Sequence, residues 1–157
     1  MGTGRSDVPS SISMTGTAYT HSMIISTLSE DRIPEVVALW EATGLTRPWN
    51  DPVADARKAL ANDGSTVLIG TDGDTLVASA MVGFDGHRGW VYYVAVSPDR
   101  QSMRLGEEIM HAAEEWLRGR GVGKLQLMIR EENHAVRSFY RRLGYQTEQV
   151  TVMSIRL

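Results

Sequence analysis

Three apolar stretches of the chain follow one another closely, and a turn sequence separates each from the next. They cover residues 66–71, 75–84 and 89–96, with Asp72-Gly73-Asp74 in the first gap and Asp85-Gly86 in the second. Apolar runs joined by Asp-Gly turns are typical of β-hairpins, because these residues tolerate the backbone angles that tight turns need. The pattern predicts an antiparallel meander of three strands.

Helical periodicity lies on both sides of this meander. Residues 105–118 place apolar side chains on one face, and residues 133–142 do the same after a short apolar strand at 124–129. The other predicted elements are a strand at 23–28, a helix at 30–42, a helix capped by Asn50 or Asp51, and a final strand at 151–157. This order favours a mixed sheet covered by helices.

The junction between the third strand of the meander and the helix that follows covers residues 96–106, Val-Ser-Pro-Asp-Arg-Gln-Ser-Met-Arg-Leu-Gly. A short polar loop at a strand-to-helix junction offers free backbone N–H groups and the positive end of a helix dipole. Such a junction suits a phosphate or pyrophosphate group.

Composition limits the classes of function that this chain supports. It has 157 residues, a net charge of −3 with neutral histidines, and no cysteine. The length predicts one domain over 23–157, preceded by a flexible arm at 1–22 that is rich in Ser, Thr and Gly. The lack of a basic excess argues against nucleic-acid partners, and no apolar run is long enough to span a membrane. We expect a cytoplasmic protein without a metal site, because its histidines lack metal-ligand spacing.

Two motifs about 27 residues apart carry a resemblance to a known family. Val96 and Pro98, followed by Gln101, Arg104 and Gly106, match the spacing of a Val-x-Pro, Gln-x-x-Gly-x-Gly signature, with arginine in place of the middle glycine. Asn133 opens the next helix, which carries Tyr140 and ends in Leu143-Gly144-Tyr145. With the order of elements, these motifs resemble the GNAT N-acetyltransferase superfamily, most closely over residues 75–157.

The resemblance implies a fold and an activity. The expected fold is α/β (α+β), with a mixed, mostly antiparallel sheet of about six to seven strands flanked by four helices. The expected enzyme uses acetyl-CoA as co-substrate and transfers its acetyl group directly, in a ternary complex, to a primary amine of a small molecule or protein. Two alternatives stay open: an acyl-CoA-binding regulatory module with little catalysis, and an acetyltransferase of protein N-terminal amines. A homodimer fits the family as well.

The resemblance also assigns residues to acetyl-CoA. The coenzyme-binding candidates are Val94, Ala95, Val96, Gln101, Ser102, Met103, Arg104, Leu105, Gly106, Asn133 and Tyr140. Backbone groups of residues 94–96 are expected beside a strand bulge, where an N–H group stabilises the developing oxyanion. Arg104 has three open interpretations: it points to solvent, it contacts a coenzyme phosphate, or it obstructs the site.

Tyr140 matches the tyrosine that protonates the leaving thiolate in this family, although its place on an apolar stripe also suits a packing role. Asn133 either bonds the coenzyme arm, caps its helix, or does both.

The sequence marks acceptor-binding residues less clearly than coenzyme-binding residues. Arg47 and Trp49 lie in a loop that borders the acceptor groove in this family, in a segment similar to that of a small bacterial branch. Candidate bases for the amine are Asp85, His87, Glu131 and Glu132, and a water molecule is an equal alternative. Asp85 also suits a purely structural role in its Asp-Gly turn.

Overall fold

A computed structural model describes residues 23–101 and 103–157. The arm expected at 1–22 lies outside the described residues, as does Ser102. The elements, in chain order, are β1 (Ile24–Thr27), the 3-10 turn η1 (Glu30–Arg32), α1 (Ile33–Ala42), α2 (Pro52–Ala61), β2 (Ser65–Asp72), β3 (Thr75–Phe84), β4 (Gly89–Val96), the 3-10 turn η2 (Pro98–Arg100), α3 (Met103–Arg118), β5 (Leu125–Gln126) and α4 (His134–Arg142).

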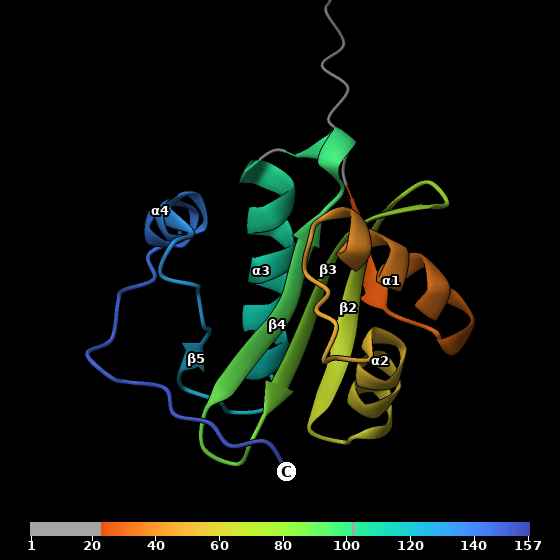
Figure 1. The fold of residues 1–157 in the computed structure, drawn as a ribbon. Coiled ribbons are helices and arrows are strands. Elements are labelled where there is room, and N and C mark those ends of the chain that lie inside the picture. The colour runs from red at the N-terminus through yellow and green to blue at the C-terminus, as the bar shows by residue number, and fades with distance from the viewer. Residues whose placement is uncertain (1–22, 102) are drawn as a thin grey trace, which may run out of the picture.

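The strands of the described residues form one sheet in the order β1-β2-β3-β4-β5 (Figure 1). The first three pairings are antiparallel, and β4 pairs with β5 in parallel. The predicted meander is confirmed, and α3 forms the crossover that a parallel neighbour requires. The mixed α/β class of the fold is confirmed as well.

Two predictions about strands are wrong. The described residues form five strands rather than six to seven, and residues 151–157 pair with none of them. The strand expected at 124–129 pairs over Leu125–Gln126 alone. A strand needs a neighbour that bonds its backbone and covers its apolar face. Residues 151–157 have neither, and Met153 and Ile155 are 89% and 84% exposed.

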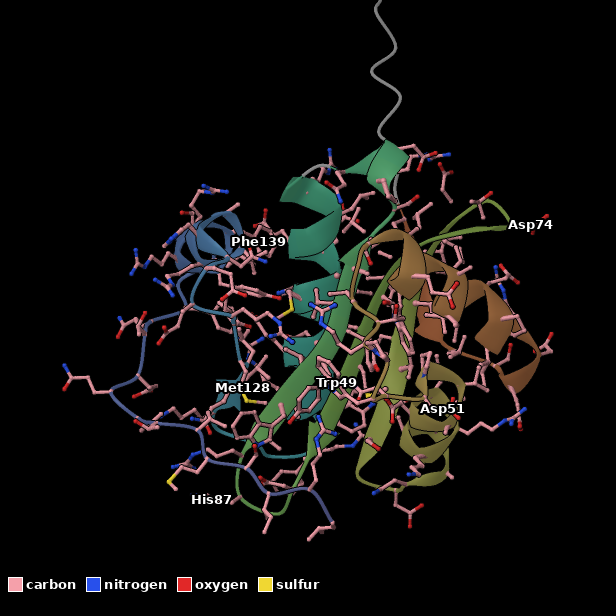
Figure 2. The ribbon with its side chains drawn as sticks, in the orientation of Figure 1. Trp49, Asp51, Asp74, His87, Met128 and Phe139 are labelled. Atoms are coloured by element: carbon pink, nitrogen blue, oxygen red, sulfur yellow. The ribbon has the colours of Figure 1, made fainter. Side chains whose placement is uncertain are left out.

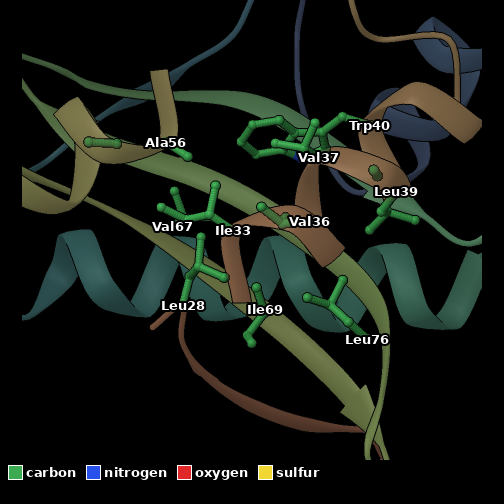
Figure 3. Packing of buried hydrophobic residues seen from close by; sticks show 12 residues of the cluster. Leu28, Ile33, Val36, Val37, Leu39, Trp40, Ala56, Val67, Ile69 and Leu76 are labelled. Atoms are coloured by element: carbon green, nitrogen blue, oxygen red, sulfur yellow. The ribbon is translucent and has the colours of Figure 1, made fainter. Parts of the chain in front are cut away.

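Helices cover both faces of the sheet (Figure 1). Successive residues of β2 alternate between the two layers: Val67 packs under α1 and α2, whereas Leu68 packs against α3. Figure 3 shows the first layer, in which Trp40 is fully buried beside Val37. The sequence pattern of apolar residues on both faces of the central strands fits this two-layer arrangement.

Local sequence fixes the helix starts that border the site. The Asp51 carboxylate accepts a hydrogen bond from the backbone N–H of Ala54 at 3.1 Å, and Pro52 follows it as the first helical residue of α2. Of the two predicted caps, Asp51 is the one used. The loop between α1 and α2 is thereby held at the end of the sheet where β4 and β5 separate.

Candidate functional site

A cleft opens where β4 and β5 diverge. Their parallel pairing joins Gly89 to Leu125 and Trp90 to Gln126, and it ends there. Beyond that point a cavity of about 790 Å³ lies between the strands, lined on one side by residues 91–94 and on the other by residues 127–130. A cavity of this size lies within the range of small-molecule binding sites.

A β-bulge deforms β4 at the edge of this cleft. Ser79 of β3 pairs with Ala95, but Met81 pairs with Tyr92, so Tyr93 and Val94 together face a single residue of β3. Tyr93 has φ of +50°, the left-handed region that side chains other than glycine rarely occupy. Such a conformation costs about 1–3 kcal/mol and turns backbone groups away from the ladder. The bulge lies next to residues 94–96, where the family resemblance places it.

Three elements hold Tyr93 in this conformation. Its ring stacks on Trp40 of α1 at a centroid distance of 4.0 Å. Its carbonyl accepts a hydrogen bond from the Ser79 hydroxyl at 2.8 Å, and that hydroxyl accepts one from the Trp40 indole at 2.9 Å. Its own hydroxyl donates to Asp55 of α2 at 2.8 Å, and burial and this bond raise the pKa of Tyr93. These contacts offset the backbone strain.

Tyr140 lies on α4 in the wall of the cavity and is 7% exposed. Its hydroxyl donates to the Met110 thioether at 4.0 Å, which is a weak acceptor. Burial raises the pKa of Tyr140 to about 12, so the phenol stays protonated at neutral pH. The structure thus places a buried proton donor with a weak internal partner at the cleft.

Asn133 lines the same cavity and caps α4. Its side-chain oxygen accepts a hydrogen bond from the backbone N–H of Val136 at 3.2 Å. The capping role is therefore present, and the amide nitrogen is the part left for a bond to the coenzyme arm. That second role stays a prediction.

Gly106, the last residue of the predicted 96–106 junction, lies in the first turn of α3. A Cβ atom at this position would lie 2.9 Å from the ring of Phe139, so glycine lets α3 and α4 pack closely. Arg104 forms an ion pair with Glu108 at 3.2 Å, and its side chain is 64% exposed. The Gln101 amide reaches the carbonyl of Val96 at 3.5 Å.

On the acceptor side, Arg47 and Trp49 both line the cavity. The guanidinium of Arg47 donates to the carbonyls of Gly44 and Thr46 at 2.7 and 2.9 Å, which shapes the α1–α2 loop. Trp49 is 57% exposed, and Figure 2 shows it between Met128 and Asp51. The loop thus brings an aromatic side chain to the cavity.

The predicted candidate bases are not among the residues that line the cavity. Asp85 accepts hydrogen bonds from the backbone N–H groups of Arg88 and His87 and from the Trp90 indole, and these bonds lower its pKa. This is the structural role expected of the turn. His87 lies at the far tip of the β3–β4 turn in Figure 2, and Glu131 and Glu132 are exposed; none of the three lines the cavity.

Sequence reasoning missed Asp55, Lys58 and Arg130, which also line the cavity. No motif marks them. The one available signal was Asp55 and Lys58 three residues apart on a predicted helix next to the Arg47–Asp51 segment.

Neither a metal cluster nor a membrane span occurs in the part of the chain that the structure describes. Residues 23–101 and 103–157 contain no group of three or more His, Asp or Glu side chains arranged for a metal ion. Within the same ranges, no helix is long and apolar enough to cross a bilayer.

Comparisons with known proteins show the family of this chain. The model of the Acetyltransferase (GNAT) family matches residues 33–145. A protein of Yersinia pestis (strain Pestoides F) named "Acetyltransferase" is 38% identical over 135 residues, which cover 86% of this chain and 96% of that protein.

Two solved structures show a similar fold at low sequence identity. AAC(6')-Iy in complex with the bisubstrate analogue CoA-S-monomethyl-acetylneamine has a TM-score of 0.75 at 15% identity, over 87% of this chain and 99% of that one. An aminoglycoside acetyltransferase from an uncultured soil metagenomic sample, in complex with sisomicin, has a TM-score of 0.72 at 17% identity, over 86% of this chain and 96% of that one.

Proposed function

The chain belongs to the GNAT acetyltransferase family and is an acetyl-CoA-dependent acyltransferase, and from this premise we propose that it acetylates a primary amine of a small molecule held in the cleft between β4 and β5. One observation carries the proposal. A strained bulge at Tyr93 and the buried hydroxyl of Tyr140 lie in the wall of a single cavity of about 790 Å³.

The proposed reaction is a direct transfer. The neutral amine attacks the thioester carbonyl, a C–N bond forms, and the C–S bond breaks as the tetrahedral intermediate collapses. The amine loses one proton to a base. The leaving CoA thiolate is hydrogen-bonded by the Tyr140 hydroxyl and ends as the thiol, with water returning to Tyr140 any proton that it gives up. Backbone N–H groups of residues 94–96, next to the bulge, face the developing oxyanion; such a donor is worth about 2.7–4 kcal/mol.

The raised pKa of Tyr140 bears on how the thiolate is protonated. A phenol with a pKa of about 12 does not donate fully to an isolated thiolate with a pKa near 8.5, since complete transfer is uphill by about 5 kcal/mol. A thiolate in the same buried place has its own pKa raised, which narrows the gap. Tyr140 therefore acts first by hydrogen-bonding the thiolate as it forms.

For acetyl-CoA, the proposed contacts follow the junction and α4. Residues 101–106 and the start of α3 receive the pyrophosphate, residues 94–96 and Asn133 receive the pantetheine arm, and Arg104 stays in solvent beside Glu108.

On the acceptor side, we propose that Arg47 and Trp49 border the bound amine, because both line the cavity. A water molecule is the proposed base, since Asp85, His87 and Glu131 lie outside the cavity lining. A cytoplasmic location also stays a prediction.

A homodimer remains part of the proposal. The apolar side chains of Val152, Met153 and Ile155 are exposed along the segment that follows α4. A second copy would cover them. Sedimentation equilibrium tests this: a monomer at all concentrations contradicts the dimer and leaves the proposed reaction untouched.

The replacement Tyr140→Phe tests the proposed reaction. It removes one hydroxyl whose internal partner is only a thioether, so the fold is retained. We expect turnover, measured as thiol release from acetyl-CoA over an amine panel, to fall about 10²–10⁴-fold with little change in acetyl-CoA affinity. Tyr145→Phe is the matched control, because its hydroxyl bonds Glu114 at 2.8 Å and Tyr145 is not among the residues that line the cavity. Equal turnover of Tyr140→Phe and Tyr145→Phe would refute the role of Tyr140.

A further inference from the structure

The charge of the cavity has the opposite sign to that of the chain. The chain carries a net charge of −3 with neutral histidines. Among the described residues that line the cavity, three are cationic (Arg47, Lys58 and Arg130) and one is anionic (Asp55), which gives the cavity a formal charge of +2. A concave site with low-dielectric walls concentrates such a potential, so the sign selects among ligands.

The cations of the cavity have no carboxylate partners within the described residues. Elsewhere on the surface arginines do find them: Arg104 pairs with Glu108 at 3.2 Å, and Arg57 pairs with Glu30 at 3.3 Å. Arg47, Lys58 and Arg130 form no ion pair in the part of the chain that is described. Cations in a cavity that form no ion pair are open to an anionic group of a ligand.

Asp55, the anionic residue of the cavity lining, is held next to the bulge of β4. Asp55 accepts a hydrogen bond at 2.8 Å from the hydroxyl of Tyr93, the residue at the bulge of β4. That bond uses Oδ2 of the carboxylate and holds the side chain in the cavity wall. A carboxylate beside the cleft is suited to receive an ammonium group before the amine is deprotonated.

The anionic Asp55 and the cationic Lys58 lie close together on α2. Asp55 and Lys58 are three residues apart on α2, a spacing that places side chains on one helix face with Cβ atoms about 5–6 Å apart. A ligand that meets both charges therefore has its amine and its anionic group only a few bonds apart.

We propose that the acceptor is a small amine that also carries an anionic group, a carboxylate or a phosphate, within a few bonds of the amine. Asp55 receives its ammonium group, and Lys58, with Arg47 and Arg130 in the same cavity, receives its anion. This inference rests on the proposed acetyltransfer and narrows it to one substrate class. A polycation such as the sisomicin bound by the metagenomic enzyme would meet net repulsion here.

Two probe pairs that differ only in the anion test the inference. They are β-alanine against β-alaninamide, and 2-aminoethyl phosphate against ethanolamine, with sisomicin as the polycation. We expect kcat/KM for thiol release to be at least 10-fold higher for the anionic member of a pair, and the pair with the larger ratio identifies the carboxylate or the phosphate. Equal values within both pairs, or sisomicin as the best acceptor, would overturn the inference.

A variant that removes the charge of Lys58 tests whether this residue binds the anionic group of the acceptor. Lys58→Gln should raise the acceptor KM at least 5-fold for the anionic probes, with the KM of acetyl-CoA unchanged. Arg57→Gln removes the same charge one residue away, at a side chain that pairs with Glu30 and is not among the residues that line the cavity, and should change neither KM. A rise in the acetyl-CoA KM of Lys58→Gln instead would assign the cation to the coenzyme and overturn the inference.

A binding measurement separates this inference from the proposed reaction. If no amine releases thiol although acetyl-CoA binds, the proposed function fails. Calorimetric titration of 2-aminoethyl phosphate and of β-alanine into the CoA complex then still decides the inference. Binding of either that Lys58→Gln weakens supports an anion-bearing ligand, and binding that Lys58→Gln leaves unchanged, or none at millimolar concentrations, overturns it.

Discussion

Two walls of the cavity differ in what they present to a ligand. The wall from β4, the segment after β5 and α4, which we call the apolar wall, presents Val94, Leu127, Ile129, Val136 and Tyr140, with Arg130 at the end of the segment after β5. The wall from the α1–α2 loop and α2, the charged wall, presents Arg47, Asp55 and Lys58. The apolar wall suits a neutral arm held through backbone groups, whereas the charged wall depends on particular side chains. Family membership therefore says much about the first and little about the second.

The largest expected effect concerns the apolar wall and is a change of stability with pH. Burial raises the pKa of Tyr140 from 10.0 to about 12, so between these values the unfolded chain releases a proton that the folded chain keeps. Tyr140 alone should lower the free energy of unfolding by about 1.4 kcal/mol per pH unit in this window and should contribute no pH dependence below it.

Urea unfolding of the wild type and Tyr140→Phe between pH 9 and 12 measures this effect, because the difference between the two isolates Tyr140 from the other tyrosines. Parallel curves would show that the apolar wall does not shield Tyr140 from water.

The next largest effect is expected at the bulge of β4, at Tyr93. Ser79→Ala removes the acceptor of the Trp40 indole and the donor to the Tyr93 carbonyl, both in a fully buried place. The free energy of unfolding should drop by about 1–3 kcal/mol in urea titrations. Ser65→Ala serves as the reference, because its hydroxyl bonds a single carbonyl at a half-buried position. An equal loss in both variants would mean that the bulge needs no support from Ser79.

The smallest effect is expected for Arg104, in the first turn of α3. Arg104→Ala breaks an exposed ion pair with Glu108, which is worth about 0.3–0.5 kcal/mol in a helix. Acetyl-CoA affinity, measured by calorimetry at low and high salt, should stay within about twofold of the wild type. A salt-dependent loss of affinity would reassign Arg104 to a coenzyme phosphate, and tighter binding would reassign it as an obstruction.

Local signals predicted most of the fold. The Asp-Gly turns gave the meander, and Asp51 with Pro52 gave the start of α2, because each acts within a few residues. The strand predicted at 151–157 failed, because an alternating apolar pattern forms a strand only where a neighbour is available to pair with it.

The candidate site, like the fold, was predicted only where local motifs mark its residues. Tyr140 and Asn133 were found through a motif, and the structure places both in the cavity. The left-handed Tyr93 and its contacts with Trp40 and Asp55 depend on residues 38 or more positions apart, which no local pattern reveals. Of the charged wall, Arg47 was predicted from its segment, whereas Asp55 and Lys58 were missed because no motif marks them.

Calorimetric titration of acetyl-CoA into the full-length protein tests the central claim most directly, because both the reaction and its acceptor depend on a coenzyme held in the cleft between β4 and β5. The account predicts one site per chain with micromolar affinity, and loss of that binding in Val94→Trp, whose larger side chain would fill the cavity beside Tyr140. Absence of heat at millimolar acetyl-CoA, or undiminished binding by a folded Val94→Trp variant, would contradict it.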